Sequence, residues 1–127
     1  IDALAALADP IRGRILVALE RHELAVGELA AALQLPQSTV SRHLKTLVEA
    51  GWIDARNDGT SRRYRLLAGA SAASTRALWK AVRESLAALP AAAHDAERLR
   101  AVLAERRSAT RAFFSSTAGT WDRLRGE

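Results

Sequence analysis

Apolar residues recur at helical spacing over the first fifty positions and predict three short helices. The first is expected to start at Asp9-Pro10, because the Asp9 side chain can accept from free backbone N–H groups and proline suits a first helical turn. The second is predicted over residues 26–33. The third is predicted from residue 37 to residue 50, with Gly51 as the residue just past its end.

The pattern changes to alternation after Gly51 and predicts a β-hairpin. Residues 52–56 are expected to form one strand, residues 57–60 the turn and residues 61–66 the return strand. The expected inward side chains are Ile53, Ala55, Tyr64 and Leu66, and those expected outward are Arg63 and Arg65.

Helical spacing returns beyond Gly69 and predicts two further helices separated by Pro90, the second ending near Ser116. Their apolar stripes comprise Leu78, Val82, Leu86 and Leu89, and then Leu99, Val102, Leu103 and Phe113. A short stripe of Ile1, Leu4 and Leu7 precedes the first helix. Apolar stripes at both ends favour a homodimer.

The order of three short helices followed by a hairpin is typical of a winged helix-turn-helix, so we expect a mainly α fold with a two-stranded wing and long C-terminal helices for dimerisation. We predict three regions. Residues 1–67 form the DNA-binding domain, residues 68–116 a helical dimerisation and linker region, and residues 117–127 the start of a further, methyltransferase-like domain.

The third helix has one apolar face and one polar face when its residues are placed at about 100° per residue. The expected inward residues are Val40, Leu44, Leu47 and Val48. The opposite face has Ser38, Arg42, Lys45 and Thr46, with Thr39 and Ser41 toward the flanks. An arginine that can bond to guanine, with hydroxyls and a lysine around it, has the chemistry needed to read a major groove. Without the neighbouring elements, the helix would read equally well as an ordinary amphipathic surface helix.

Several motifs in order resemble the ArsR/SmtB family of bacterial homodimeric winged-helix repressors. They are Leu-Ala-Asp-Pro-Ile-Arg at residues 7–12, Val-Gly-Glu-Leu-Ala at residues 26–30 and Gln-Ser-Thr-Val-Ser-Arg-His-Leu-Lys at residues 37–45. The resemblance implies that the third helix reads the major groove, that residues 57–64 form the wing and that the first and last helices form the dimer interface. Pro36 departs from the family, in which a serine cap is common at that position.

The candidate DNA-binding residues follow from the helix face and the wing. They are Gln37, Ser38, Thr39, Ser41, Arg42, His43, Lys45, Arg56, Arg62 and Arg63. Arg42 is the best candidate for base readout, and Arg62 and Arg63 are the expected phosphate contacts of the wing. Trp52, Ile53, Leu44 and Leu47 are expected to be structural. Trp79 is expected in the core or the dimer interface, with a ligand platform as the alternative.

Composition narrows the function further. The chain has 127 residues and a net charge of +5, which favours an anionic partner such as double-stranded DNA. It has no cysteine, so disulfides, thiol switches and thiolate metal sites are excluded. The residues show no catalytic constellation, and we expect neither an enzyme nor a resident cofactor. With no apolar run long enough to span a membrane, a cytoplasmic protein is expected.

Metal sensing is an open alternative, because the family often senses metals. Here Ala25 and Gly27 stand where some members have cysteines, and the three histidines, His22, His43 and His94, are scattered. A basic helical dimerisation module that binds RNA or a protein is the other alternative. The arginines clustered around Asp58-Gly59 argue against that module.

Residues 113–125 resemble the opening of a class I methyltransferase domain. The alternative is an amphipathic helix end that packs on the dimer through Phe113, Trp121 and Leu124. The resemblance implies an effector such as S-adenosylhomocysteine or S-adenosylmethionine, sensed beyond this chain. We therefore expect a DNA-binding transcriptional repressor that binds an inverted-repeat operator as a homodimer and is released by a small molecule.

Overall fold

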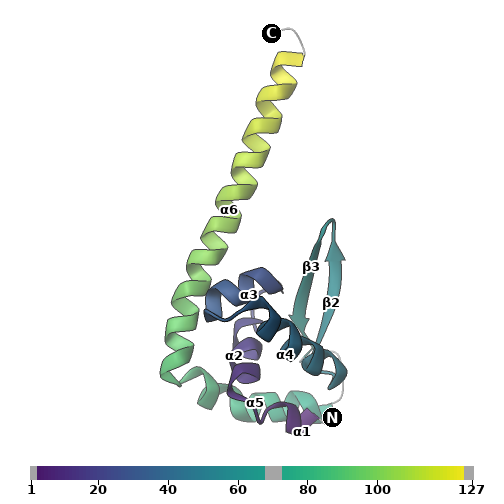
Figure 1. Ribbon diagram of the computed structural model, residues 1–127, viewed down its shortest axis with the longest axis vertical. Helices are drawn as coiled ribbons and strands as arrows, with labels where there is room; N and C mark the ends of the chain where they lie inside the picture. The colour runs from purple at the N-terminus through teal and green to yellow at the C-terminus, as the bar shows by residue number, and fades with distance from the viewer. Residues whose placement is uncertain (1–2, 68–72, 125–127) are drawn as a thin grey trace.

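The computed structural model describes residues 3–67 and 73–124, with the backbone alone described for residues 3, 73–75 and 113–124. The elements, in chain order, are α1 (Ala3–Ala6), α2 (Pro10–Ala18), β1 (Leu24–Ala25), α3 (Val26–Leu33), α4 (Gln37–Glu49), β2 (Ile53–Asp58), β3 (Ser61–Leu66), α5 (Ala73–Ala87) and α6 (Pro90–Leu124). Helices α2, α3 and α4 cluster beside the hairpin, α5 runs beneath them, and α6 rises along one side and extends past them (Figure 1).

The predicted helix boundaries are confirmed for the helix-turn-helix region. Asp9 caps α2, because its Oδ1 accepts from the backbone N–H of Ile11 at 2.8 Å. Helix α3 has the predicted bounds, and α4 begins at Gln37 and ends one residue earlier than predicted. Gly51 follows with a φ of +83°, a left-handed conformation that favours glycine after a helix end.

The hairpin belongs to a three-stranded antiparallel sheet with the order β1-β3-β2. The short strand β1, which the sequence pattern did not reveal, pairs Leu24 with Tyr64. Strand β2 extends through Asp58, which pairs with Ser61, so the predicted four-residue turn is wrong at its start. The turn consists of two residues, Gly59 and Thr60, and the φ of +66° at Gly59 permits this tight reversal.

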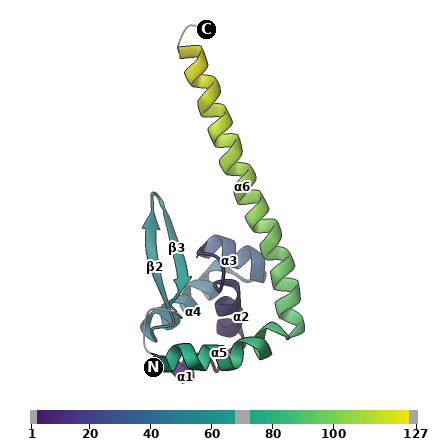
Figure 2. The same ribbon diagram turned by 180° about the vertical axis from the view of Figure 1, so that it is seen from behind.

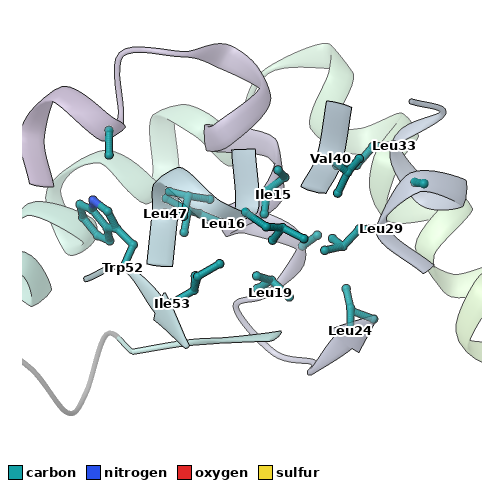
Figure 3. Close-up of a cluster of buried hydrophobic side chains, with 14 of the residues drawn as sticks. Ile15, Leu16, Leu19, Leu24, Leu29, Leu33, Val40, Leu47, Trp52 and Ile53 are labelled. Carbon is teal, nitrogen blue, oxygen red and sulfur yellow. The ribbon is translucent and has the colours of Figure 1, made fainter. Parts of the chain in front are cut away.

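The core lies where α2, α3, α4 and the base of the sheet meet (Figure 3). Its largest fully buried side chains are Ile15, Leu16, Leu24, Leu29, Leu33, Val40, Leu44, Leu47, Trp52 and Ile53. The Trp52 ring meets the ring of Trp79 edge-on, with centroids 6.3 Å apart, which joins α5 to this core. The prediction that Val48 faces inward is wrong, because Val48 is 38% exposed at the solvent edge of the α4 stripe.

Helix α6 is attached to the helix-turn-helix region by a buried carboxylate near its start. Asp95 accepts two hydrogen bonds from Arg14 of α2, at 2.7 and 2.8 Å, and one from Arg98 of α6 at 2.9 Å. The same arginines donate to the last carbonyls of α3, Arg14 to Leu33 and Arg98 to Ala32. These carbonyls have no intrahelical donor, and cations are favourable at a helix C-terminus. Asp95 therefore connects α2, α3 and α6.

A second attachment lies about three turns further along α6. Arg106 pairs with both carboxylate oxygens of Glu28 in α3 and also donates to the carbonyl of Glu23. Glu28 in turn accepts from the backbone N–H of Ala25 at the start of α3. Burial alone would raise the pKa of Glu28, but the bonds from Arg106 and Ala25 lower it below its ordinary value. Helix α6 is thus held at both ends of α3.

Beyond this attachment, α6 extends away from the rest of the molecule, as both views show (Figures 1 and 2). It continues without interruption through Leu124, so the prediction that this helix ends near Ser116 is wrong. The three-region division and the tail resemblance stay predictions, and Ile1 and Gly69 lie outside the described residues. Within the described residues, no helix is both long and apolar enough to cross a membrane.

Asp95→Asn is expected to lower the free energy of unfolding by about 2–4 kcal/mol, because two arginines lose the carboxylate that orders them. Urea unfolding followed by circular dichroism measures this change. Glu97→Gln, at an exposed position of the same helix, is the control and should change stability by less than about 0.5 kcal/mol. Equal effects of the two substitutions would contradict the role given to Asp95.

Candidate nucleic-acid interface

The exposed face of α4 brings together most of the candidate residues on that helix. Gln37, Ser38, Ser41, Arg42 and Lys45 are exposed, and Thr39 is half-buried. The opposite face anchors the helix through Val40, Leu44 and Leu47, which are fully buried. Among the described residues, no carboxylate forms an ion pair with Arg42 or Lys45. Both cations are therefore available to an external anion.

The start of α4 is open to solvent. Pro36 is its N-cap residue and gives no side-chain cap, although its carbonyl accepts from the N–H groups of Thr39 and Val40 at 3.1 Å. The tight turn before it is made by Gln34, which has a left-handed φ of 55°. Gln37 lies against α3, since a methyl group on Gly27 would be 3.3 Å from Gln37 Nε2. The departure at Pro36 thus leaves the predicted helix start unchanged.

His43 lies apart from the other candidates on α4. It is only 8% exposed, and its Nδ1 is 3.3 Å from Nη1 of Arg12 in α2. Arg12 is itself held by the carbonyl of Ala6, to which its Nε donates at 2.6 Å. The structure therefore places His43 between α4 and α2 rather than on the exposed face.

The two faces of the wing carry different chemistry. The register pairs Asp54 with Arg65 and Arg56 with Arg63, which puts these four residues on one face. The other face carries Ile53, Ala55, Tyr64 and Leu66 at the base and, nearer the tip, Asn57 and Arg62. The predicted inward positions of Ile53, Tyr64 and Leu66 are confirmed by their packing in the core, whereas Ala55 shares their face and is half-buried. Consecutive residues alternate across a strand, so Arg62 and Arg63 point to opposite faces.

Ion pairs neutralise the charged face of the wing. Arg56 binds both oxygens of Glu23, at 2.6 and 3.0 Å, and Arg65 binds both oxygens of Asp54, at 2.7 and 3.2 Å. Arg63 lies 3.4 Å from Asp58. The bonds from Arg56 and Arg65 lower the pKa of Glu23 and of Asp54, respectively, so both carboxylates stay charged at neutral pH.

Arg62 differs from the other wing arginines. Its guanidinium carbon lies 5.6 Å from the ring centroid of Tyr64, in a cation–π arrangement. No carboxylate of the described residues pairs with it, and its side chain is exposed. Its face of the hairpin is the one whose base, at Ile53, packs into the core with Leu44 and Leu47 of α4. Arg62 is therefore on the face of the wing whose base packs into the core together with α4.

Three partners of the candidate residues were not found from the sequence: Arg12 beside His43, Glu23 with Arg56 and Asp58 with Arg63. The alternation of Asp54, Arg56 and Asp58 opposite Arg63 and Arg65 is a usable signal for cross-strand ion pairs, because side chains two residues apart share a face. No comparable signal points to Glu23 or Arg12, which reach their partners from other elements.

In the part of the chain that the structure describes, no group of three or more His, Cys, Asp or Glu side chains is placed to hold a metal ion. His22 and His94 are both exposed. The cations of the candidate DNA-binding residues lie on two elements, the exposed face of α4 and the hairpin.

These elements define a winged helix-turn-helix domain: α2, α3 and α4 follow one another, α3 packs against α4, and a basic hairpin follows. The sequence profile described as "Bacterial regulatory protein, arsR family" matches residues 9–55. The winged helix-turn-helix DNA-binding domain of Mb0332 from Mycobacterium bovis, a possible ArsR-family transcriptional regulator, is 30% identical with a TM-score of 0.56. That match covers 65% of this chain and 73% of the other. The chain belongs to the ArsR family.

Named regulators are among its relatives. The repressor SmtB of Mycobacterium tuberculosis is 42% identical over 65 residues, or 51% of this chain and 48% of SmtB. The regulator CmtR of Mycobacterium bovis is 49% identical over 61 residues, or 48% of this chain and 52% of CmtR. Reduced HlyU from Vibrio cholerae has a TM-score of 0.55 at 33% identity, covering 65% of this chain and 82% of HlyU. The chain spans about half the length of the curated relatives named here.

These comparisons concern regulators and leave the tail untested. The profile ends at residue 55, and the side chains of residues 113–124 lie outside the described ones. The methyltransferase resemblance and the expected response to S-adenosylhomocysteine or S-adenosylmethionine stay predictions.

His43→Ala is expected to lower the free energy of unfolding by about 1–3 kcal/mol, because it removes a buried side chain that joins α4 to Arg12. Ser41→Ala, on the exposed face of the same helix, should change it by less than about 0.5 kcal/mol. Urea titration of both variants gives the comparison. A His43 variant as stable as the Ser41 variant would return His43 to the list of DNA contacts.

Proposed function

We propose that this chain is the DNA-binding and dimerisation region of a transcriptional repressor. The observation that carries the proposal is the distribution of unpaired cations. Arg42 and Lys45 on α4, and Arg62 on the adjoining face of the wing, are exposed and have no carboxylate partner among the described residues. Three other wing arginines are paired within the chain.

This distribution fits a partner with regularly spaced negative charges. In the proposed complex, α4 enters the major groove and Arg42 bonds to a base edge, with Ser38, Ser41 and Lys45 beside it. Arg62 contacts a phosphate of the flanking backbone. Arg56 and Arg63, which were expected to contact DNA, serve first to fix the shape of the wing.

A homodimer is part of the proposal. The Mb0332 domain is described as homodimeric, and Leu4 of α1 in this chain is 66% exposed, an apolar side chain available for an interface. Two-fold symmetry in the protein implies an inverted repeat in the operator, with half-sites about 34–36 Å apart.

The function is tested by selecting binding sites from a random pool of duplex DNA with the whole chain. Enrichment of an inverted repeat that outcompetes random DNA supports the proposal. Equal affinity for RNA of the same length, with no sequence enriched, would instead identify a basic module that binds RNA. Repeating the selection with added zinc tests the alternative of a metal-sensing repressor, because zinc would weaken the enrichment for such a protein.

Arg42→Ala is expected to weaken binding to the selected operator by about 1–3 kcal/mol and to remove discrimination at one base pair, because a bidentate base contact is lost. Fluorescence anisotropy on the operator and its single-base variants measures both effects. Lys80→Ala removes an exposed cation from α5 and should leave both unchanged. Intact base preference in the Arg42 variant would exclude Arg42 from readout.

Arg62→Ala is expected to weaken operator and random DNA alike and to reduce the dependence of log K on log salt by about 0.9, the value for one phosphate contact. Arg65→Ala is the matched control, because Arg65 is an exposed arginine of the same strand that is already bound to Asp54. Titrations at several salt concentrations give the slopes. Equal losses in slope for the two variants would show that an ion pair within the wing does not prevent an arginine from contacting a phosphate.

A further inference from the structure

A groove of about 440 Å³ lies between α2, α5 and α6, away from the exposed face of α4. Apolar side chains line much of it: Val17, Ala18, Ala87, Ala96, Leu99 and Leu103. Charged or titratable side chains complete the lining: Glu20, Arg21, His22, Arg83 and Arg100. Its volume lies within the range of about 300–1,000 Å³ that is usual for small-molecule sites.

The only carboxylate among these lining residues is already engaged. Glu20 accepts from Arg83 at 2.6 and 2.7 Å and from the indole N–H of Trp79 at 3.2 Å. The bonds from Arg83 lower the pKa of Glu20, so this pair persists at neutral pH. Arg21 and Arg100 are exposed and form no ion pair among the described residues, although the charge of Arg21 also helps to lower the pKa of Glu20. The groove therefore combines an apolar lining with an excess of positive charge.

We infer that this groove binds a small organic carboxylate with an apolar body. The apolar part would lie along Val17 and Leu99, where it removes hydrocarbon surface from water. The carboxylate would lie at the rim, where Arg100 and Arg21 supply the charge that complements it. The occupant is identified by this complementarity, because the uncompensated charge of the rim is positive.

The groove adjoins a chain of contacts that reaches the reading helix. Trp79, bonded to Glu20, packs edge-on against Trp52. The backbone N–H of Trp52 donates to Leu47 of α4, and its carbonyl accepts from Leu67, directly after the wing. A ligand that competes with Glu20 for Arg83 would change the surroundings of Trp79. A resulting effect on DNA rests on the proposed function, whereas binding of the carboxylate does not.

The test uses octanoate and the whole chain, with octanamide as an uncharged probe of similar size and shape. Isothermal titration calorimetry should show saturable binding of octanoate, at least about tenfold tighter than that of octanamide, and tryptophan emission should change with the same midpoint. Equal affinities for the two probes, or no saturable binding, would overturn the inference. Neither result bears on DNA binding, which the operator selection tests separately.

Two pairs of variants locate the site. Arg100→Ala should weaken octanoate binding about three- to tenfold, whereas Arg111→Ala, an exposed arginine three turns further along α6, should not. Ala96→Phe fills the groove and should abolish binding, whereas Ala101→Phe, also at an exposed alanine of α6, should leave it intact. Circular dichroism checks that each variant is folded.

Sedimentation velocity on the Ala96→Phe variant tests whether a second copy of the chain, rather than a small carboxylate, occupies the groove. Loss of a dimer in this variant, together with no octanoate binding by the parent chain, would assign the groove to a subunit interface and overturn the proposal. Parent-like sedimentation with loss of octanoate binding supports a ligand site.

Discussion

The carboxylate of Asp95 in α6 holds this helix to α2 and α3, which lie much earlier in the sequence. It orders Arg14 and Arg98, and these arginines in turn satisfy the last carbonyls of α3. Because the C-terminus of α3 leads directly into the turn before α4, helix α4 starts from a point that α6 helps to fix. Each arginine is attracted both to the buried carboxylate and to the partial negative charge at the C-terminus of α3.

Ion pairs between arginines and carboxylates also determine which cations of the wing can bind an external anion. Arginines that lie opposite one another across β2 and β3 would repel, and Glu23, Asp54 and Asp58 compensate them. Arg62 is left with an aromatic partner and an exposed guanidinium. A hairpin with four arginines therefore offers an external anion fewer free cations than its composition indicates.

The helix-turn-helix was predictable because its signals are local. Asp9-Pro10 starts α2 and Gly51 follows the end of α4 through the conformation of the adjacent backbone. The apolar stripe of α4 likewise depends only on the spacing of residues within that helix. The hairpin was predicted for the same reason, although its turn is shorter than expected. Strand β1 was missed because two residues are too few to show an alternating pattern. It forms because Leu24 pairs with Tyr64, which is forty positions away in the chain.

The sequence by itself determined the class of fold, the exposed polar face of α4 and the excess of basic residues. These follow from helical periodicity, turn chemistry and net charge, which need no knowledge of distant neighbours. Only the tertiary structure decided which basic residues are free. Arg56 is occupied by Glu23, His43 lies between two helices beside Arg12, and Arg62 is exposed, because a side chain's availability depends on partners brought to it by other elements.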